Sequence, residues 1–294
     1  MREILNSKLI LGTVQFGLDY GVNNKLGKAN SSNVKLILDT AFKEGVLLLD
    51  SAENYGDSHE KIGEYHKNSS NSFQVITKFS SARLDLPANI KERVYKNLKT
   101  LNIKSLYSYM FHSFDDYNKF YPVFKEDLLF LKKEKSIQKI GVSLYTNEEL
   151  EELLKNDDVD LVQLPFNLFD NSSRRKEILL KAKSKGLEIH VRSTFLQGLF
   201  FKNVNSIQGK ILPLKPYLED LEQIKNKYKV STETLALQYA LQKNYIDRVL
   251  IGVDSAEQLK KNIYICSEKT DIPTKVIDNI NIKEGSLLNP INWI

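Results

Sequence analysis

Short apolar runs alternate with longer amphipathic segments along almost the entire chain. Apolar runs of roughly four to eight residues are typical of buried strands, and apolar residues spaced three and four apart are typical of helices. The pattern predicts strands at residues 8–13, 47–50, 73–78, 106–111, 138–142, 159–164, 187–191 and 248–251. It predicts helices at residues 33–44, 58–67, 89–101, 120–135, 147–155, 172–185, 216–228, 231–243 and 255–268.

A strict alternation of strands and helices predicts parallel strands joined by right-handed crossovers. Eight such units in 294 residues match the size of one (β/α)8 barrel, the TIM barrel. The sequence has no Gly/Ser linker, no low-complexity tract and no repeat beyond this structural one. We therefore predict an α/β fold with a single barrel domain over residues 1–294, on which a tail at residues 287–294 packs.

Composition narrows the class of protein. Charged residues make up 27% and hydrophobic residues 41%, and no run approaches the roughly 20 apolar residues of a membrane span. The first eight residues lack the apolar core of a signal peptide, and the only cysteine, Cys266, has no partner for an internal disulfide. The net charge of +5 is spread over helical surfaces. These features favour a soluble, cytoplasmic protein that binds neither membranes nor nucleic acid.

Four ionisable residues stand at or just after the carboxyl ends of successive predicted strands: Asp50, Tyr55, Lys78 and His112. Neighbouring strands of a parallel barrel lie about 4.8 Å apart, so three successive strand ends fall within roughly 10 Å. We expect these four side chains to meet on the catalytic face of the barrel.

The chemistry of this set suits proton transfer to an oxygen. Tyr55 is the predicted general acid and base, and the Lys78 ammonium, held charged by Asp50, is expected to lower the phenol pKa from its usual value near 10. His112 would donate a hydrogen bond to the same oxygen. The set has no metal-ligand spacing, no nucleophile beside a base and no paired carboxylates. The set suits protonation of a carbonyl oxygen while another group delivers a hydride to the carbonyl carbon, which implies a nicotinamide cofactor.

These motifs together resemble the aldo-keto reductase family over nearly the whole chain. The segments that carry the resemblance are residues 11–17 (Leu-Gly-Thr-Val-Gln-Phe-Gly), 49–56 (Leu-Asp-Ser-Ala-Glu-Asn-Tyr-Gly) with Glu60 and Gly63, 76–78, 111–112, 140–143, 162–163 with Asn167, 197–199 and 251–262. The resemblance implies a reductase of aldehydes or ketones that uses NADPH or NADH and is monomeric or a weak homo-oligomer.

The same resemblance implies a set of cofactor-binding residues. They are Gly12, Thr13, Ser143, Gln163, Arg192, Ser193, Gly252, Val253, Asp254, Gln258 and Asn262. Ser143 and Gln163 are the candidates for binding the nicotinamide carboxamide, and Gly12 could equally serve only a tight strand exit.

The chain departs from the family pattern at three places. Arg192 stands where an aromatic residue usually stacks on the nicotinamide; it could stack there too, or it could hold a carboxylate or phosphate of the substrate. Leu144 replaces a common asparagine. Asp254 and Gln258 stand where arginines commonly bind a 2′-phosphate, which favours NADH, although Lys260 and Lys261 could compensate.

Other features have open interpretations. The loop at residues 14–28 is either an irregular connection or a wall over the substrate. The aromatic residues that could line that wall are Phe16, Tyr20, Phe79, Phe114, Phe169, Phe195 and Trp293. His59, His66 and His190 are expected to be structural. Besides a reductase of small carbonyl compounds, the sequence leaves open a reductase of activated or phosphorylated sugars and a regulatory subunit that binds nicotinamide without catalysis.

Overall fold

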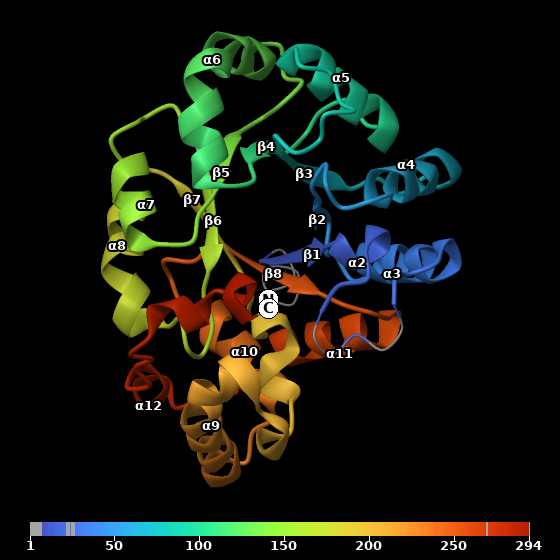
Figure 1. Ribbon diagram of the computed structural model, residues 1–294. Helices are drawn as coiled ribbons and strands as arrows, with labels where there is room; N and C mark the ends of the chain where they lie inside the picture. The colour runs from blue at the N-terminus through green and yellow to red at the C-terminus, as the bar shows by residue number, and fades with distance from the viewer. Residues whose placement is uncertain (1–7, 22–23, 25–26, 269, 294) are drawn as a thin grey trace.

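The eight predicted strands form a closed parallel barrel in the order β1 to β8 (Figure 1). The structure, a computed structural model, describes residues 8–21, 24, 27–268 and 270–293. The strands are β1 Leu9–Gly12, β2 Leu48–Asp50, β3 Gln74–Phe79, β4 Ser108–Phe111, β5 Ile140–Ser143, β6 Leu161–Pro165, β7 Glu188–Arg192 and β8 Arg248–Gly252. The predicted fold class, an α/β barrel of one domain, is confirmed.

All nine predicted helices are present around the barrel (Figure 1). They are α3 Ser31–Lys43, α4 Ser58–Asn68, α5 Ile90–Leu101, α6 Phe114–Lys133, α7 Asn147–Leu153, α8 Ser172–Ser184, α9 Lys215–Tyr228, α10 Thr232–Leu241 and α11 Ala256–Ser267. The predicted start of α6, residue 120, was wrong. The helix begins at Phe114 because the Ser113 side chain accepts a hydrogen bond from the backbone N–H of Asp116 and caps it.

Several short elements were not predicted. Two are short α-helices, α2 Val14–Gly17 and α12 Thr274–Asp278, and five are short stretches of 3-10 helix: η1 Leu196–Phe201, η2 Val204–Ser206, η3 Gly209–Leu214, η4 Gly285–Leu288 and η5 Pro290–Trp293. The loop at residues 14–28 is therefore not wholly irregular, since α2 opens it; residues 22, 23, 25 and 26 of this loop lie outside the described residues.

Alternation along the strands separates two apolar layers. One set of side chains fills the barrel interior: Ile10, Leu48, Ile76, Tyr107, Met110 and Leu161. The residues between them point outward and pack under the surrounding helices, as Leu11 and Leu49 do. Among the described residues, none of the helices is long and apolar enough to cross a membrane.

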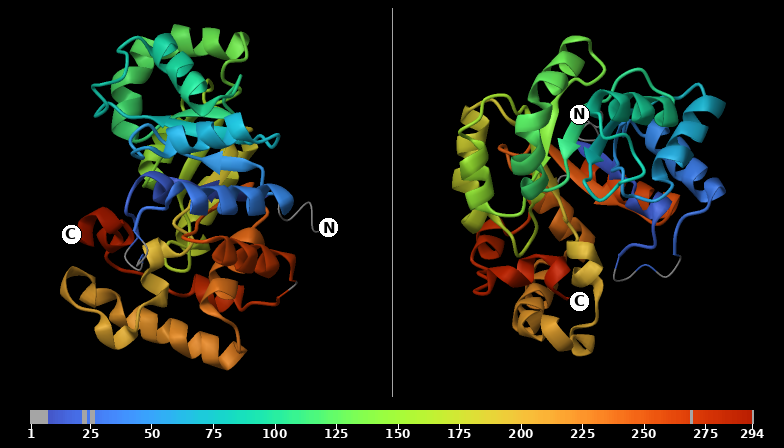
Figure 2. Two further views of the ribbon diagram at one scale, coloured as in Figure 1. Left: turned by 90° about the vertical axis from the view of Figure 1, so that its right-hand side faces the viewer. Right: turned by 45° about the horizontal axis from the view of Figure 1, so that its top comes forward.

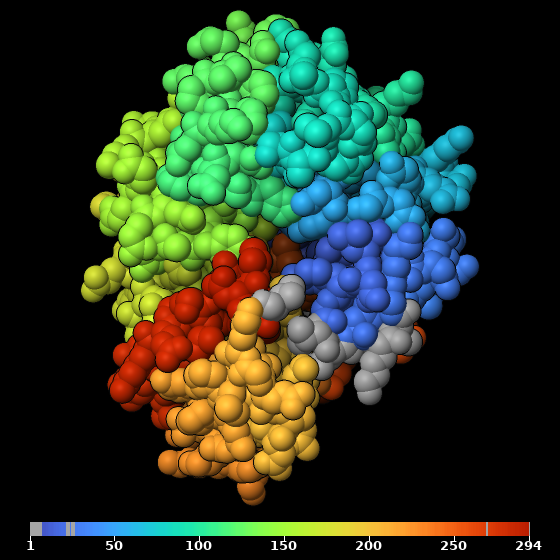
Figure 3. Space-filling model, in the orientation of Figure 1, coloured from blue at the N-terminus to red at the C-terminus, as the bar shows by residue number. Residues whose placement is uncertain are grey.

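The loops that follow the strands gather at the end of the barrel that faces the viewer in Figures 1 and 3. Figure 2 places the C-terminal segment, in red, at this end, and the start of β1 at the opposite end. The Leu287 and Leu288 side chains of this segment are buried in the core, and Trp293 Nε1 donates to the Leu287 carbonyl at 2.9 Å. The predicted tail thus packs on the barrel over residues 287–293; residue 294 lies outside the described residues.

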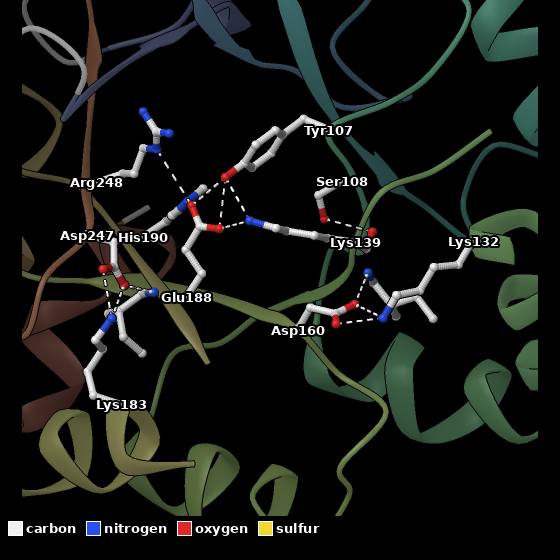
Figure 4. A network of polar contacts seen from close by, with 12 residues as sticks. Tyr107, Ser108, Lys132, Lys139, Asp160, Lys183, Glu188, His190, Asp247 and Arg248 are labelled. Carbon is white, nitrogen blue, oxygen red and sulfur yellow. Dashed lines mark hydrogen bonds and ion pairs between the residues drawn. The ribbon is translucent and has the colours of Figure 1, made fainter. Parts of the chain in front are cut away.

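A network of ion pairs occupies the opposite end, where the strands begin (Figure 4). Glu188 lies at its centre: it pairs with Lys139, accepts from the Tyr107 hydroxyl at 2.7 Å and contacts His190 Nε2 at 2.7 Å. Lys183 pairs with Asp247 at 2.7 Å and Lys132 with Asp160 at 2.6 Å. Polar groups at this face of a barrel ordinarily serve stability, which agrees with a structural role for His190.

Candidate active site

A buried ion pair between the ends of β2 and β3 forms the floor of the site. Lys78 Nζ lies 2.5 Å from Asp50 Oδ1 and also donates to the Ser51 carbonyl at 3.1 Å. Gln163 Nε2 donates to Asp50 Oδ2 at 2.8 Å, so both carboxylate oxygens have a partner. Burial lowers the pKa of Lys78, and the Asp50 charge opposes that effect. The ion pair thus keeps the Lys78 ammonium inside the rim of the barrel.

Tyr55 lies above this pair and beside His112. Lys78 Nζ is 5.5 Å from the centre of the Tyr55 ring, and the His112 ring meets the Tyr55 ring edge-on with 5.7 Å between centres. The structure therefore brings together all four side chains that the sequence predicted to meet.

The pKa of Tyr55 shifts in the direction opposite to the predicted one, which was a lowering by Lys78. Part of the side chain reaches the surface, but protein atoms surround it closely, and burial, followed by the Asp50 charge, raises its pKa well above 10. The Arg192 charge opposes these effects without reversing them. The phenol is consequently protonated at neutral pH and available as an acid.

His112 is a neutral imidazole. Burial first, and then the charges of Lys78 and Arg192, lower its pKa to about 3. A neutral imidazole has one ring N–H to donate and one ring nitrogen to accept. Its Nδ1 is buried and has no hydrogen-bond partner among the described residues. The ring is thus able to bind a further polar group.

Two glycines fix the loop that carries Tyr55. A Cβ on Gly17, at the end of α2, would lie 1.7 Å from the Tyr55 carbonyl oxygen, and a Cβ on Gly56 would lie 2.2 Å from the Gly17 carbonyl oxygen. Gly56 also has a φ of +53°, which side chains disfavour. Both glycines stood in the motifs used above, but nothing in the sequence alone showed that they touch each other.

A buried acid in the same loop was missed by the sequence analysis. The Glu53 carboxylate accepts hydrogen bonds from Arg93 Nε at 2.9 Å, Asn97 Nδ2 at 2.7 Å and the Tyr109 hydroxyl at 2.7 Å. The backbone N–H of Ser80 donates to it at 3.2 Å. Glu53 thereby ties the Tyr55 loop to α5, β3 and β4; the only sequence signal was a charged residue inside an otherwise functional motif.

The predicted cofactor residues lie at the carboxyl ends of five strands and on α11. The positions are the ends of β1 (Gly12, Thr13), β5 (Ser143), β6 (Gln163), β7 (Arg192, Ser193) and β8 (Gly252, Val253, Asp254), with Gln258 and Asn262 on α11. Some of these already have internal contacts. Thr13 Oγ1 donates to the Asp50 carbonyl at 3.0 Å, Gln163 donates to Asp50, and a Cβ on Gly12 would touch Leu250 at 3.1 Å.

The loop after β8 is arranged around Asp254. Its backbone N–H donates to Gln258 Oε1 at 2.8 Å, and Asn33 Nδ2 donates to its carbonyl at 2.9 Å. Asp254 Oδ1 is buried and has no hydrogen-bond partner among the described residues, and burial raises the pKa of this carboxyl. Of the two nearby lysines, Lys261 is paired with Glu233 at 2.5 Å.

Three of the seven aromatic residues that could have lined the wall pack in the core instead. Phe16, Phe79 and Phe169 are buried in the hydrophobic core, where Phe79 packs on Phe111 and Phe169 on Phe200. Tyr20 remains exposed at this face, and its hydroxyl accepts a hydrogen bond from Gln197 Nε2 at 2.8 Å. The first loop therefore contacts the segment after β7, and Figure 3 shows these two segments and the C-terminal one meeting near the middle of the face.

His59 and His66 have internal partners, as expected of structural residues. His59 Nε2 lies 2.8 Å from Thr77 Oγ1. His66 Nδ1 lies 2.8 Å from the Leu101 carbonyl, and its Nε2 accepts from the backbone N–H of Phe73 at 3.2 Å. Neither ring is available at the catalytic face.

Comparison with known proteins identifies the family of the chain. The model of the Aldo/keto reductase family matches residues 8–284. The chain belongs to this family. It is therefore an oxidoreductase by family, and members of the family bind nicotinamide cofactors and act on small carbonyl substrates.

Individual relatives are distant. The chain is 23% identical over 301 residues to an NADH-specific methylglyoxal reductase of Escherichia coli (strain K12), covering 89% of this chain and 90% of that protein. An aldo-keto reductase from Bacillus halodurans, solved in its holo form, is 20% identical with a TM-score of 0.72, covering 95% of this chain and 94% of that one. A glycerol dehydrogenase from Gluconobacter oxydans has the same identity and TM-score, covering 93% and 90%. These two structures are similar in fold.

Proposed function

We propose that this chain is an NADH- or NADPH-dependent reductase of aldehydes or ketones, with Tyr55 as its general acid and base. The observation that carries the proposal is the buried Asp50–Lys78 pair beneath a protonated Tyr55, with the His112 ring against the edge of the phenol. Every group needed for proton transfer to a carbonyl oxygen is present within this cluster.

Each residue has a distinct task. The Tyr55 hydroxyl gives its proton to the carbonyl oxygen: its O–H bond breaks, a new O–H bond forms on the substrate, and a tyrosinate remains. The Lys78 ammonium lies close enough to stabilise that negative charge, and Asp50 keeps the lysine protonated despite its burial. His112 donates its N–H to the same oxygen and orients the carbonyl group. A bound reduced nicotinamide would supply the hydride, with its electron pair, to the carbonyl carbon.

The residues present fit a nicotinamide cofactor. Ser143 and Gln163 would bind the carboxamide; the Gln163 amide nitrogen carries two hydrogens, so its bond to Asp50 leaves one hydrogen and the Oε1 acceptor for this purpose. The buried, unpartnered Asp254 Oδ1 is an acceptor suited to a ribose hydroxyl. A carboxylate there would repel a 2′-phosphate, and the E. coli relative is named as NADH-specific, so both observations support NADH.

Small carbonyl compounds are the proposed substrates. The name of the E. coli relative supports including methylglyoxal, a 2-oxoaldehyde, among the first compounds to be assayed. Keto sugars and sugar phosphates belong in the same panel because the loops over the site, which decide substrate choice, differ from one family member to the next.

The test is the substitution Tyr55→Phe. It removes the acidic hydroxyl and little else, so kcat should fall about 100- to 10,000-fold while NADH binding, followed by its fluorescence, stays within a few-fold. Tyr264→Phe, which removes a hydroxyl from an exposed ring on α11, is the control and should retain full activity. Activity of Tyr55→Phe within a few-fold of the unaltered enzyme would reject the assignment.

A further inference from the structure

Arg192 is a half-buried cation without a carboxylate partner. It ends β7 on the catalytic face, and its guanidinium lies over the Tyr145 ring, 4.3 Å from the ring centre. Its Nη2 donates to the Leu144 carbonyl at 3.2 Å and its Nη1 to Ser193 Oγ at 3.4 Å. Among the described residues, no Asp or Glu oxygen lies within 4.0 Å of it, in contrast to the buried Arg93 and Arg175.

This arrangement leaves much of the guanidinium unused. It has five N–H donors, and within the described part of the chain only two of them make hydrogen bonds, both long and both to uncharged oxygens. Charged side chains that are withdrawn from water ordinarily have a charged partner. Tyr145 covers one face of the guanidinium and fixes its plane, so the donor edge is held in a defined orientation.

The positive charge of Arg192 also acts on the catalytic cluster. Burial has the largest influence on the pKa of Tyr55, Lys78 and His112, and Arg192 is among the charges that act on all three. Because Asp50 neutralises Lys78, Arg192 leaves the site with a net positive charge. A negative group bound here would lie beside the reacting carbonyl.

We propose that Arg192 binds an anionic group of the substrate, a carboxylate or a phosphate, so that the preferred substrates are aldehydes or ketones bearing a negative charge near the carbonyl. Two parallel N–H bonds from the guanidinium edge match the geometry of either group. The inference rests on the proposed reductase function and narrows its substrate class. The competing role is stacking on the nicotinamide, which would place this cation against the positive ring of the oxidised cofactor.

Matched substrate pairs test the proposal. Succinic semialdehyde and butanal differ by a terminal carboxylate, and glyceraldehyde 3-phosphate and glyceraldehyde differ by a phosphate. In at least one pair, kcat/KM of the unaltered enzyme should favour the anion about 10- to 100-fold, the range expected of charge-assisted hydrogen bonds. The pair that responds identifies the anion.

The variant Arg192→Gln should reduce that preference to near unity, because kcat/KM should fall about 10- to 100-fold more for the anionic partner of a pair than for the neutral one. Arg192→Lys, which retains the charge without the planar fork, should keep part of the preference. Lys181→Gln is the control for loss of one positive charge on an outer helix and should behave as the unaltered enzyme.

Three results would overturn the proposal. The unaltered enzyme could prefer both neutral partners, Arg192→Gln could keep the anion preference, or it could weaken NADH binding and lower activity on both partners equally, which would identify nicotinamide stacking. Calorimetric titration of succinate and inorganic phosphate into the NADH complex separates this proposal from the proposed function. Tighter binding to the unaltered protein than to Arg192→Gln supports the anion site even if neither aldehyde is reduced, and equal binding rejects it.

Discussion

We expect a double-mutant cycle at the buried Asp50–Lys78 pair to separate stability from activity. The double variant should recover part of the stability that each single variant loses, but none of the activity. Both side chains are almost fully buried, at 3% and 1% exposure, with 2.5 Å between Nζ and Oδ1. Asp50→Asn or Lys78→Met alone leaves an uncompensated buried charge, which typically costs about 3–5 kcal/mol. At roughly 2.1 cal/mol/K per residue, the unfolding entropy of 294 residues is about 0.6 kcal/mol/K, so each single variant should melt about 5–8 °C lower.

The double variant has no unpaired charge, so its loss of stability should be well below the sum of the two single losses, by about 2 kcal/mol or more. Its activity should stay as low as that of either single variant because the cation beside Tyr55 is gone. In Asp50→Asn the pKa of Lys78, already lowered by burial, should fall further, which moves the alkaline limb of the reduction profile to lower pH. Urea unfolding followed by circular dichroism, with steady-state kinetics on the same samples, measures both quantities. Additive stability losses, or multiplicative activity losses, would refute the coupling.

Three further predictions concern the cofactor, acid stability and the Tyr55 loop. NADH and NADPH should be used with efficiencies within about 100-fold, roughly 2.7 kcal/mol, and Asp254→Arg should shift preference towards NADPH; a thousandfold preference of the unaltered enzyme for NADPH would contradict this. Burial lowers the pKa of His59 to about 4, so its share of stability is complete above about pH 6.5 and is lost as pH falls towards 4. Between pH 7 and pH 4, the free energy of unfolding measured with urea should fall by about 2–3 kcal/mol more in the unaltered protein than in His59→Gln. Gly17→Ala should inactivate the enzyme because its Cβ would meet the Tyr55 carbonyl oxygen at 1.7 Å, whereas Gly285→Ala, with its nearest neighbour 3.6 Å away, should be tolerated in the same carbonyl-reduction assay.

Periodicity was sufficient for the barrel because each strand is a buried run followed by an amphipathic helix. It placed Asp50 and Lys78 at neighbouring strand ends, and the parallel register Asp50↔Ile76, two residues before Lys78, brings them together. The start of α6 was missed since a capping serine, not an apolar repeat, determines it. Local sequence patterns thus predict the barrel and those residues whose positions follow directly from the strand ends.

Contacts between distant loops could not be predicted. The Glu53–Arg93 pair joins a loop to a helix 40 residues away, and its partners are distinguished from surface charges only by burial, which the sequence does not show. For the same reason the sequence left open whether Phe79 and Phe169 pack in the core or line the substrate pocket: aromatic residues at or after a strand end can turn inward or outward. The pKa direction of Tyr55 likewise depends on how closely other atoms surround it.

The contact between Gly17 and Gly56 has a bearing on how new specificities arise in this scaffold. Main chain meets main chain there, so this contact itself does not depend on any side chain. By contrast, the first loop and the turns after β7 meet through a side-chain hydrogen bond, from Gln197 to Tyr20. Mutations in those outer segments can therefore change substrate choice while the proton donor keeps its position. New specificities can arise in this way without loss of the reaction.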